Sequence, residues 1–173
     1  MAHRGDVDVS FLLLGDYSLS SKLREATANE LIEHNQFYAK HDHLERAAKC
    51  MDTDLPTVLQ SLTDATSIPN DLSELKIKEG RSTNELNTWS SMIQVLALSS
   101  VIGKKIVSAF PDLPHYAQSL YDAEICPRIE NNSYNLQDSP VILWTRENLD
   151  NKASVFVPDH VVPLVKAGDN RNK

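Results

Sequence analysis

Apolar residues recur every three or four positions through the first third of the chain, as they do in helices with one buried face. The stripe over residues 22–39 predicts a first helix, and Ser20 supplies a capping hydroxyl just before it. Shorter stretches of the same pattern predict helices over 44–51 and 56–62. Residues 63–81 are rich in Ser, Thr, Asp and Lys and are predicted to form a loop.

The middle of the chain predicts a longer helix followed by a strand. Residues 82–85 read Ser-Thr-Asn-Glu, which is a capping box, and the stripe over 86–100 predicts a helix that Gly103 ends. The β-branched run at 106–110 predicts a strand directly afterwards. Residues 116–125 predict another short helix, because the Cys-Pro pair that follows would end it.

Three short apolar runs near the C-terminus predict adjacent strands of one sheet, at 141–144, 155–157 and 161–165. Helices lead and strands trail, so the predicted fold class is α+β (mixed α/β), with helices packed on a small C-terminal β-sheet. A chain of 173 residues is long enough for one domain with its own core. We assign that domain to residues 1–166 and expect 167–173 to be a frayed tail.

The acidic charge balance narrows the classes of partner. With 24 acidic and 17 basic residues the net charge is -7, which disfavours a nucleic acid held mainly through its phosphates. No run approaches the ~18 apolar residues of a membrane-spanning helix, and no signal peptide is expected at the start. Two cysteines are too few for a disulfide framework, so we expect an intracellular protein, cytoplasmic or nuclear.

His160 is the strongest single candidate for chemistry. It lies between two predicted strands, where a sheet can hold a general base, although a lone histidine is more often a packed or surface residue. His34, His41 and His43 invite a metal site, but helical spacing separates them, so we expect solvated or capping roles and no metal. Cys50 is expected to be inert, and no cofactor-binding motif is present, so no cofactor is expected.

Four short sequence segments, taken in their order along the chain, resemble those of a known family. They are Leu23-Arg24 with Asn35-Gln36-Phe37-Tyr38, then Trp89 to Ala97 with Ile106-Val107, then Val141-Ile142-Leu143-Trp144, and finally Pro158 to Leu164. This order resembles the ovarian tumour (OTU) family of cysteine proteases, and in particular the divergent OTU-like domains of vertnin and of many transposon-associated invertebrate proteins.

The resemblance implies a papain-like fold that removes ubiquitin from proteins, with a cysteine at a helix N-terminus and a histidine on a strand. His160 matches the base. The nucleophile should come from an Asp-Gly-Asn-Cys-like loop ahead of Leu23, but Arg4 or Val9 takes its place, depending on the alignment, and Ser10 is one residue off. Asp6 is a candidate for the orienting acid.

The third catalytic position is altered as well. The family often has Asp or Asn two residues after the histidine, where this chain has Val162, and Asp159 should point to the opposite face of its strand. We therefore expect an OTU-like domain without protease activity that binds ubiquitin or another protein. Two alternatives remain open: an active deubiquitinase whose N-terminal catalytic loop is missing from this sequence, and a non-ubiquitin interaction domain of a transposon-derived or regulatory protein.

Overall fold

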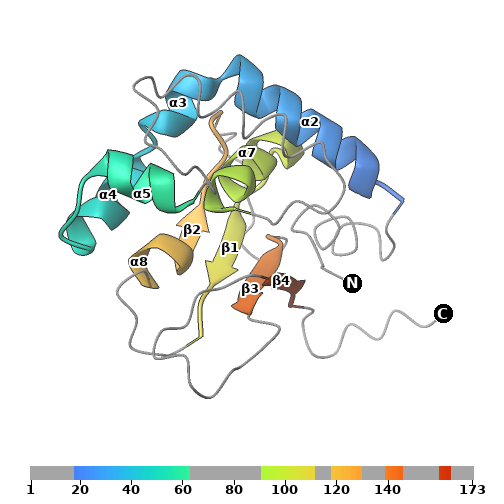
Figure 1. Cartoon of the computed structure of the whole chain (residues 1–173). Helices are drawn as coiled ribbons and strands as arrows, with labels where there is room; N and C mark the ends of the chain where they lie inside the picture. Colours follow the sequence, from blue (N-terminus) through green and yellow to red (C-terminus); the bar gives the residue numbers. More distant parts are fainter. Residues whose placement is uncertain (1–17, 63–90, 112–117, 130–138, 146–159, 165–173) are drawn as a thin grey trace.

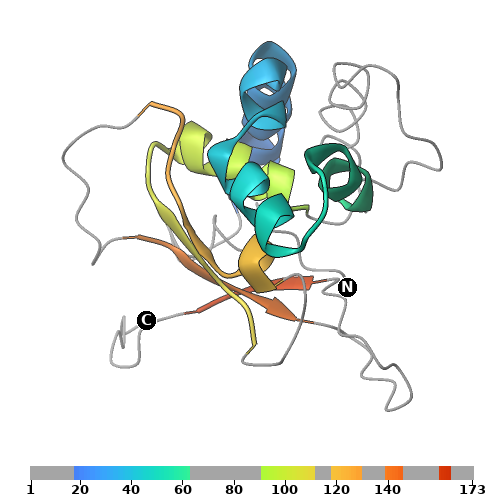
Figure 2. The same cartoon turned by 90° about the vertical axis from the view of Figure 1, so that its left-hand side faces the viewer.

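The protein is described by a computed structural model over residues 18–62, 91–111, 118–129, 139–145 and 160–164. Its helices gather on one face of a small mixed β-sheet, as the two views in Figure 1 and Figure 2 show. The predicted α+β class is therefore confirmed. No helix in the described ranges is long and apolar enough to cross a membrane.

The four N-terminal helices are α2 (Ser20–Glu33), α3 (Asn35–Ala39), α4 (Asp42–Cys50) and α5 (Leu55–Ser61). The second and third predicted helices are confirmed as α4 and α5. The single helix predicted over 22–39 is wrong in one respect, because His34 leaves the helical region at φ -116°, ψ 30° and separates α2 from α3. Tyr38 and Ala39 of α3, which follow the break, are buried.

Helix α7 (Met92–Ile102) lies between α2 and the sheet (Figure 2). Every residue from Met92 to Ser99 is buried, so the one-faced stripe predicted here is wrong: a helix covered on all sides needs apolar residues all round. Gly103 ends the helix in the left-handed conformation at φ 60°, as predicted.

The helix predicted over 86–100 is wrong at its start, because Ser91 has an extended backbone at φ -104°, ψ 162° and is the N-cap of α7. The Ser91 backbone N–H donates to Gln94 Oε1 at 3.1 Å and so gives α7 its own polar cap. The capping box predicted at 82–85 and the stripe positions Leu86 and Trp89 lie outside the described residues.

The sheet has the strand order β2-β1-β3-β4. Strand β1 (Ile106–Ala109) runs parallel to β3 (Val141–Thr145), while β2 (Ala123–Ile125) and β4 (His160–Pro163) pair antiparallel with β1 and β3 respectively. Strands β1, β3 and β4 confirm three predicted runs, and β3 and β4 are neighbours as expected. The run predicted at 155–157 lies outside the described residues.

The helix predicted over 116–125 is wrong beyond its first half. Helix α8 (Gln118–Tyr121) ends early, and the next residues form strand β2, in which Ile125 is paired with Ile106. Both of these isoleucines are almost fully buried. Pairing with β1 and burial of Ile125 decide the local structure here, which the local helix pattern does not reveal.

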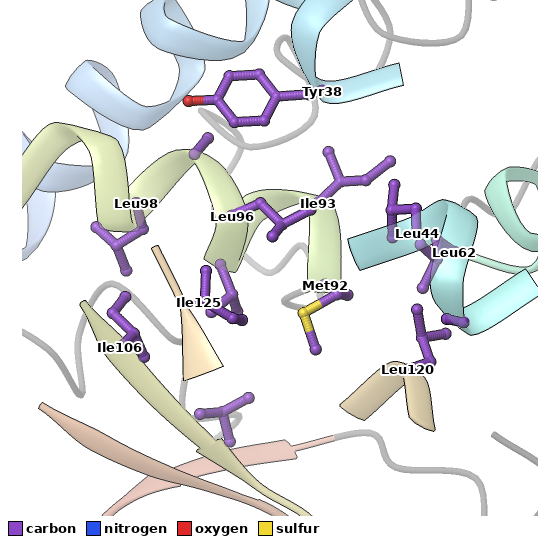
Figure 3. Close-up of a cluster of buried hydrophobic side chains, with 14 of the residues drawn as sticks. Tyr38, Leu44, Leu62, Met92, Ile93, Leu96, Leu98, Ile106, Leu120 and Ile125 are labelled. Atoms are coloured by element: carbon purple, nitrogen blue, oxygen red, sulfur yellow. The ribbon is translucent and has the colours of Figure 1, made fainter. Parts of the chain in front are cut away.

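A continuous apolar core fills the space between α7, the N-terminal helices and the sheet. Figure 3 shows Met92, Ile93 and Leu96 of α7 pointing among side chains of α4, α8, β1 and β2. The fully buried members include Leu31, Leu44, Leu59, Ile106 and Trp144. This core fixes where the edge of the sheet lies relative to the helices.

Candidate functional site

His160 is the first residue of β4, the strand at one end of the described sheet. Its backbone is in register with Thr145, the last residue of β3. The next residue, Val161, is in register with Trp144, and both of these side chains are buried in the core. The backbone that carries His160 is therefore held by strand pairing and by core packing one residue away.

Trp144 ties this part of the sheet to its neighbours. Its indole Nε1 donates a hydrogen bond to Ser108 Oγ on β1 at 2.8 Å, and Ser108 in turn donates to the backbone carbonyl of Tyr121 at 2.5 Å. The rings of Tyr121 and Trp144 also meet at an angle of 60°, with centroids 4.8 Å apart. These contacts satisfy the buried indole N–H and link β3, β1 and α8.

The other expected members of the site fall elsewhere. Asp6, Arg4, Val9 and Ser10 lie outside the described residues, as does Asp159. Val162, two residues after the histidine, is a half-buried residue of β4 in register with Leu143. Its apolar side chain cannot orient an imidazole by hydrogen bonding.

Cys126 lies far from the start of β4. Cys126 follows β2, and the register places the end of β2 and the start of β4 at opposite corners of the sheet. About three strand spacings of ~4.8 Å across and about five rises of ~3.3 Å along the strands put these corners roughly 20 Å apart. Cys50 is the exposed last residue of α4, at the opposite end of that helix from its N-terminus.

The three clustered histidines have separate roles. His34 is half-exposed, and its Nε2 lies 3.7 Å from Glu30 Oε2. His41 is the N-cap of α4, which is one of the roles that were expected for these histidines. His43 was expected to be solvated or capping, and that is wrong: it is 5% exposed, with Nε2 2.7 Å from the Leu120 carbonyl oxygen. Its place in the core depends on α8, which lies far along the chain. Within the described ranges, no three acidic, histidine or cysteine side chains form a metal-binding group.

A family model described as the vertnin OTU domain matches residues 8–145. The chain belongs to the vertnin OTU domain family. The matched part of this OTU domain contains all described helices and strands β1, β2 and β3, and it ends at Thr145, so His160 and β4 fall beyond it. No curated protein and no solved structure matches the chain.

The OTU domain also contains a polar cluster that the sequence did not predict. Glu30 Oε1 accepts hydrogen bonds from Tyr38 Oη at 2.7 Å and from Arg128 Nε at 2.9 Å. Ser100 Oγ lies 2.7 Å from Tyr38 Oη and accepts from the Arg128 backbone N–H at 2.9 Å. These four residues join α2, α3 and α7 to the segment after β2. No sequence signal could have found the cluster, since its members span 98 positions.

The cluster perturbs its own titratable groups. Burial alone would raise the pKa of the Glu30 carboxyl, but the hydrogen bonds from Arg128 and Tyr38 and the Arg128 charge hold it below its usual value. Burial, together with the Glu30 carboxylate, raises the pKa of the Tyr38 phenol. Glu30 is therefore ionised and Tyr38 neutral at pH 7, which is the arrangement in which Tyr38 donates to Glu30.

Proposed function

We propose that this OTU domain binds ubiquitin or a ubiquitinated protein without cleaving it. The observation that carries the proposal is the position of the two thiols. Cys50 is the last residue of α4, and Cys126 follows β2 at the corner of the sheet opposite the start of β4. A base without a thiolate leaves only the small residual rate that oxyanion donors and binding provide. Family membership supports the choice of ubiquitin as the partner.

His160 is assigned the position of the ancestral base in this proposal, and Asp6 that of the acid that would orient it. The backbone of His160 is held by pairing with Thr145, and the adjacent Val161 is anchored in the core. A rigid strand of this kind suits a residue that has to meet a partner in one orientation. We place the ubiquitin contact at the corner of the sheet formed by the end of β3 and the start of β4.

The absence of proteolysis is tested with ubiquitin that carries a C-terminal propargylamide, which forms a covalent adduct with a catalytic thiolate. We expect no adduct with the wild-type domain, while an active OTU protease serves as the positive control. An adduct that disappears in Cys50→Ala or in Cys126→Ala would show that one of these thiols is catalytic after all. An adduct that persists in the double variant would point to a different nucleophile, and either result would reject the inactive assignment.

Binding is tested separately by titrating isotope-labelled mono- and di-ubiquitin with the domain and following NMR shifts. We expect saturable shifts with a Kd in the range of about 10 to 500 μM, which is typical of weak transient contacts. Thr145→Lys at the proposed corner should weaken binding by about tenfold, while Asn29→Lys on the exposed side of α2 makes the same change of charge and serves as the surface control. No saturable shift with either ubiquitin form would favour a domain that binds a different protein.

A further inference from the structure

Helix α4 begins with an unusual capping residue. His41 is its N-cap, with an extended backbone at φ -67°, ψ 129°, and its Nδ1 accepts a hydrogen bond from the His43 backbone N–H at 3.1 Å. Ser, Thr, Asp and Asn are the common residues in this position. An imidazole caps only while Nδ1 carries a free lone pair, so protonation of His41 removes the acceptor and places a positive charge at the helix N-terminus.

His43, in the first turn of α4, connects this helix to α8. Its ring is buried, and Nε2 lies 2.7 Å from the Leu120 carbonyl oxygen of α8, 77 positions along the chain. Because a carbonyl only accepts, His43 must donate its Nε2–H, which fixes the neutral tautomer. Figure 3 shows the adjacent Leu44 of α4 in the same apolar cluster as Leu120. Protonation of His43 would bury a charge in this cluster.

The groups around the two rings offer little to stabilise a charge. Two rings of α3 lie beside His41. The Phe37 ring is edge-on to the His41 ring, with centroids 5.3 Å apart, and the Tyr38 ring is parallel to it, with centroids 6.5 Å apart. On α4 itself, Asp42 favours a charged His41, whereas Arg46 disfavours a charge on either histidine.

The other described helices that pack on α4 add no further charge. Helix α5 contains no ionisable residue. Helix α8 contributes the Leu120 carbonyl, which favours a charged His43, and one ionisable side chain, Tyr121, whose ring packs on Phe110 and Trp144. Burial outweighs the favourable neighbours: it lowers the pKa of His41 to about 4, with His43 and Arg46 adding to the effect, and it also lowers the pKa of His43.

We propose that His41 and His43 form an acid-released latch that holds α4 against α3 and α8. Both rings are neutral and the latch is closed above about pH 6.5, the ordinary pKa of histidine. The unfolded or opened chain takes up protons first as the pH falls, so the stabilisation is lost progressively between about pH 6.5 and about pH 4. Opening would expose Leu44, Ala47 and Ala48, the apolar face of α4 that is buried in the closed state.

The test uses the full chain and two measurements at about pH 7.5 and about pH 5: urea unfolding, and hydrogen–deuterium exchange of residues 41–50 corrected for intrinsic rates. For the wild type, the opening equilibrium of α4 should rise at least about thirtyfold between the two pH values, because the protonation of His41 in the opened chain alone contributes about that factor. In the double variant His41→Asn, His43→Gln the cap acceptor and the donor to Leu120 are kept but neither residue titrates. The logarithm of the increase in its opening equilibrium between the two pH values should be less than half that of the wild type.

His34→Asn is the matched control, because it removes a half-exposed histidine that lies between α2 and α3, outside the latch, and it should behave as the wild type does. Equal pH dependence in the double variant and the wild type would overturn the proposal. Should the double variant fail to fold at the higher pH, NMR titration of the wild-type rings decides instead: neutral shifts of His41 and His43 retained at about pH 5.5 support the latch, and titration of both near 6.5 rejects it.

Discussion

Tyr38→Phe tests whether the polar cluster of Glu30, Tyr38, Ser100 and Arg128 stabilises the fold. The substitution removes one hydroxyl and leaves the ring in its buried position, where it also meets the Phe37 ring edge-on at 5.1 Å. The hydroxyl lies 2.7 Å from both Glu30 Oε1 and Ser100 Oγ. The change therefore deletes two short hydrogen bonds without creating a large cavity.

The expected loss follows from the kind of bond that is removed. A hydrogen bond to a charged acceptor contributes about 1.5–3 kcal/mol and one between neutral groups about 1 kcal/mol. Arg128 still donates to Glu30 through Nε and to Ser100 through its backbone N–H, so neither partner is left without a hydrogen bond. We therefore expect the free energy of unfolding to fall by about 2 kcal/mol, slightly less than the sum of the two contributions.

The assay is urea unfolding followed by circular dichroism at pH 7. With an m-value of about 2 kcal/mol/M, the midpoint should fall by about 1 M. In a double-mutant cycle of Tyr38→Phe with Glu30→Gln, the losses of unfolding free energy should differ from additivity by about 0.5 kcal/mol or more. The control is Glu25→Gln, which changes an exposed carboxylate of the same helix and whose effect should add to that of Tyr38→Phe. A loss under about 0.5 kcal/mol for Tyr38→Phe, or additive behaviour with Glu30→Gln, would refute the reasoning.

Three further predictions concern the backbone, the indole and the thiols. Gly103→Ala should cost about 1 kcal/mol of stability in urea unfolding, because φ is 60° at this position although a Cβ would meet nothing within 4 Å; no measurable loss would contradict this. Trp144→Phe should lower stability by about 2–3 kcal/mol, since it deletes the hydrogen bond to Ser108 and leaves space in the core, and a loss under about 1 kcal/mol would show that the indole is not a main anchor of β3. In the native protein a thiol reagent should modify the exposed Cys50 faster than the half-buried Cys126, as single Cys→Ala variants would reveal, and equal rates would disprove the difference in burial.

The strand that carries His160 could be predicted from the sequence, because it depends on residues that are neighbours in the chain. The apolar run at 161–165 predicted a strand directly after His160, and β4 begins at that residue. The position of Cys126 relative to that strand could not be predicted. It depends on the order β2-β1-β3-β4 and on the mixed pairing, which brings the end of β2 to the opposite corner of the sheet.

The histidines show the same division. The capping role expected for the cluster is found at His41, because an N-cap is decided by the residues of one turn. The burial of His43 depends on α8, whose Leu120 carbonyl lies 77 positions away. A pattern read along the chain contains no information about that partner, so His43 was expected on the surface.

Local sequence patterns were enough to predict helices α4 and α5, strands β1, β3 and β4, and the end of α7 at Gly103, because each rests on short-range periodicity or on a local backbone preference. The family was predicted from the order of four short sequence segments. Contacts between distant segments were needed to make residues 123–125 a strand, to bury α7 on all sides and to bring Glu30 to Arg128. Burial and pairing between such segments contribute more free energy than the local preferences that they override.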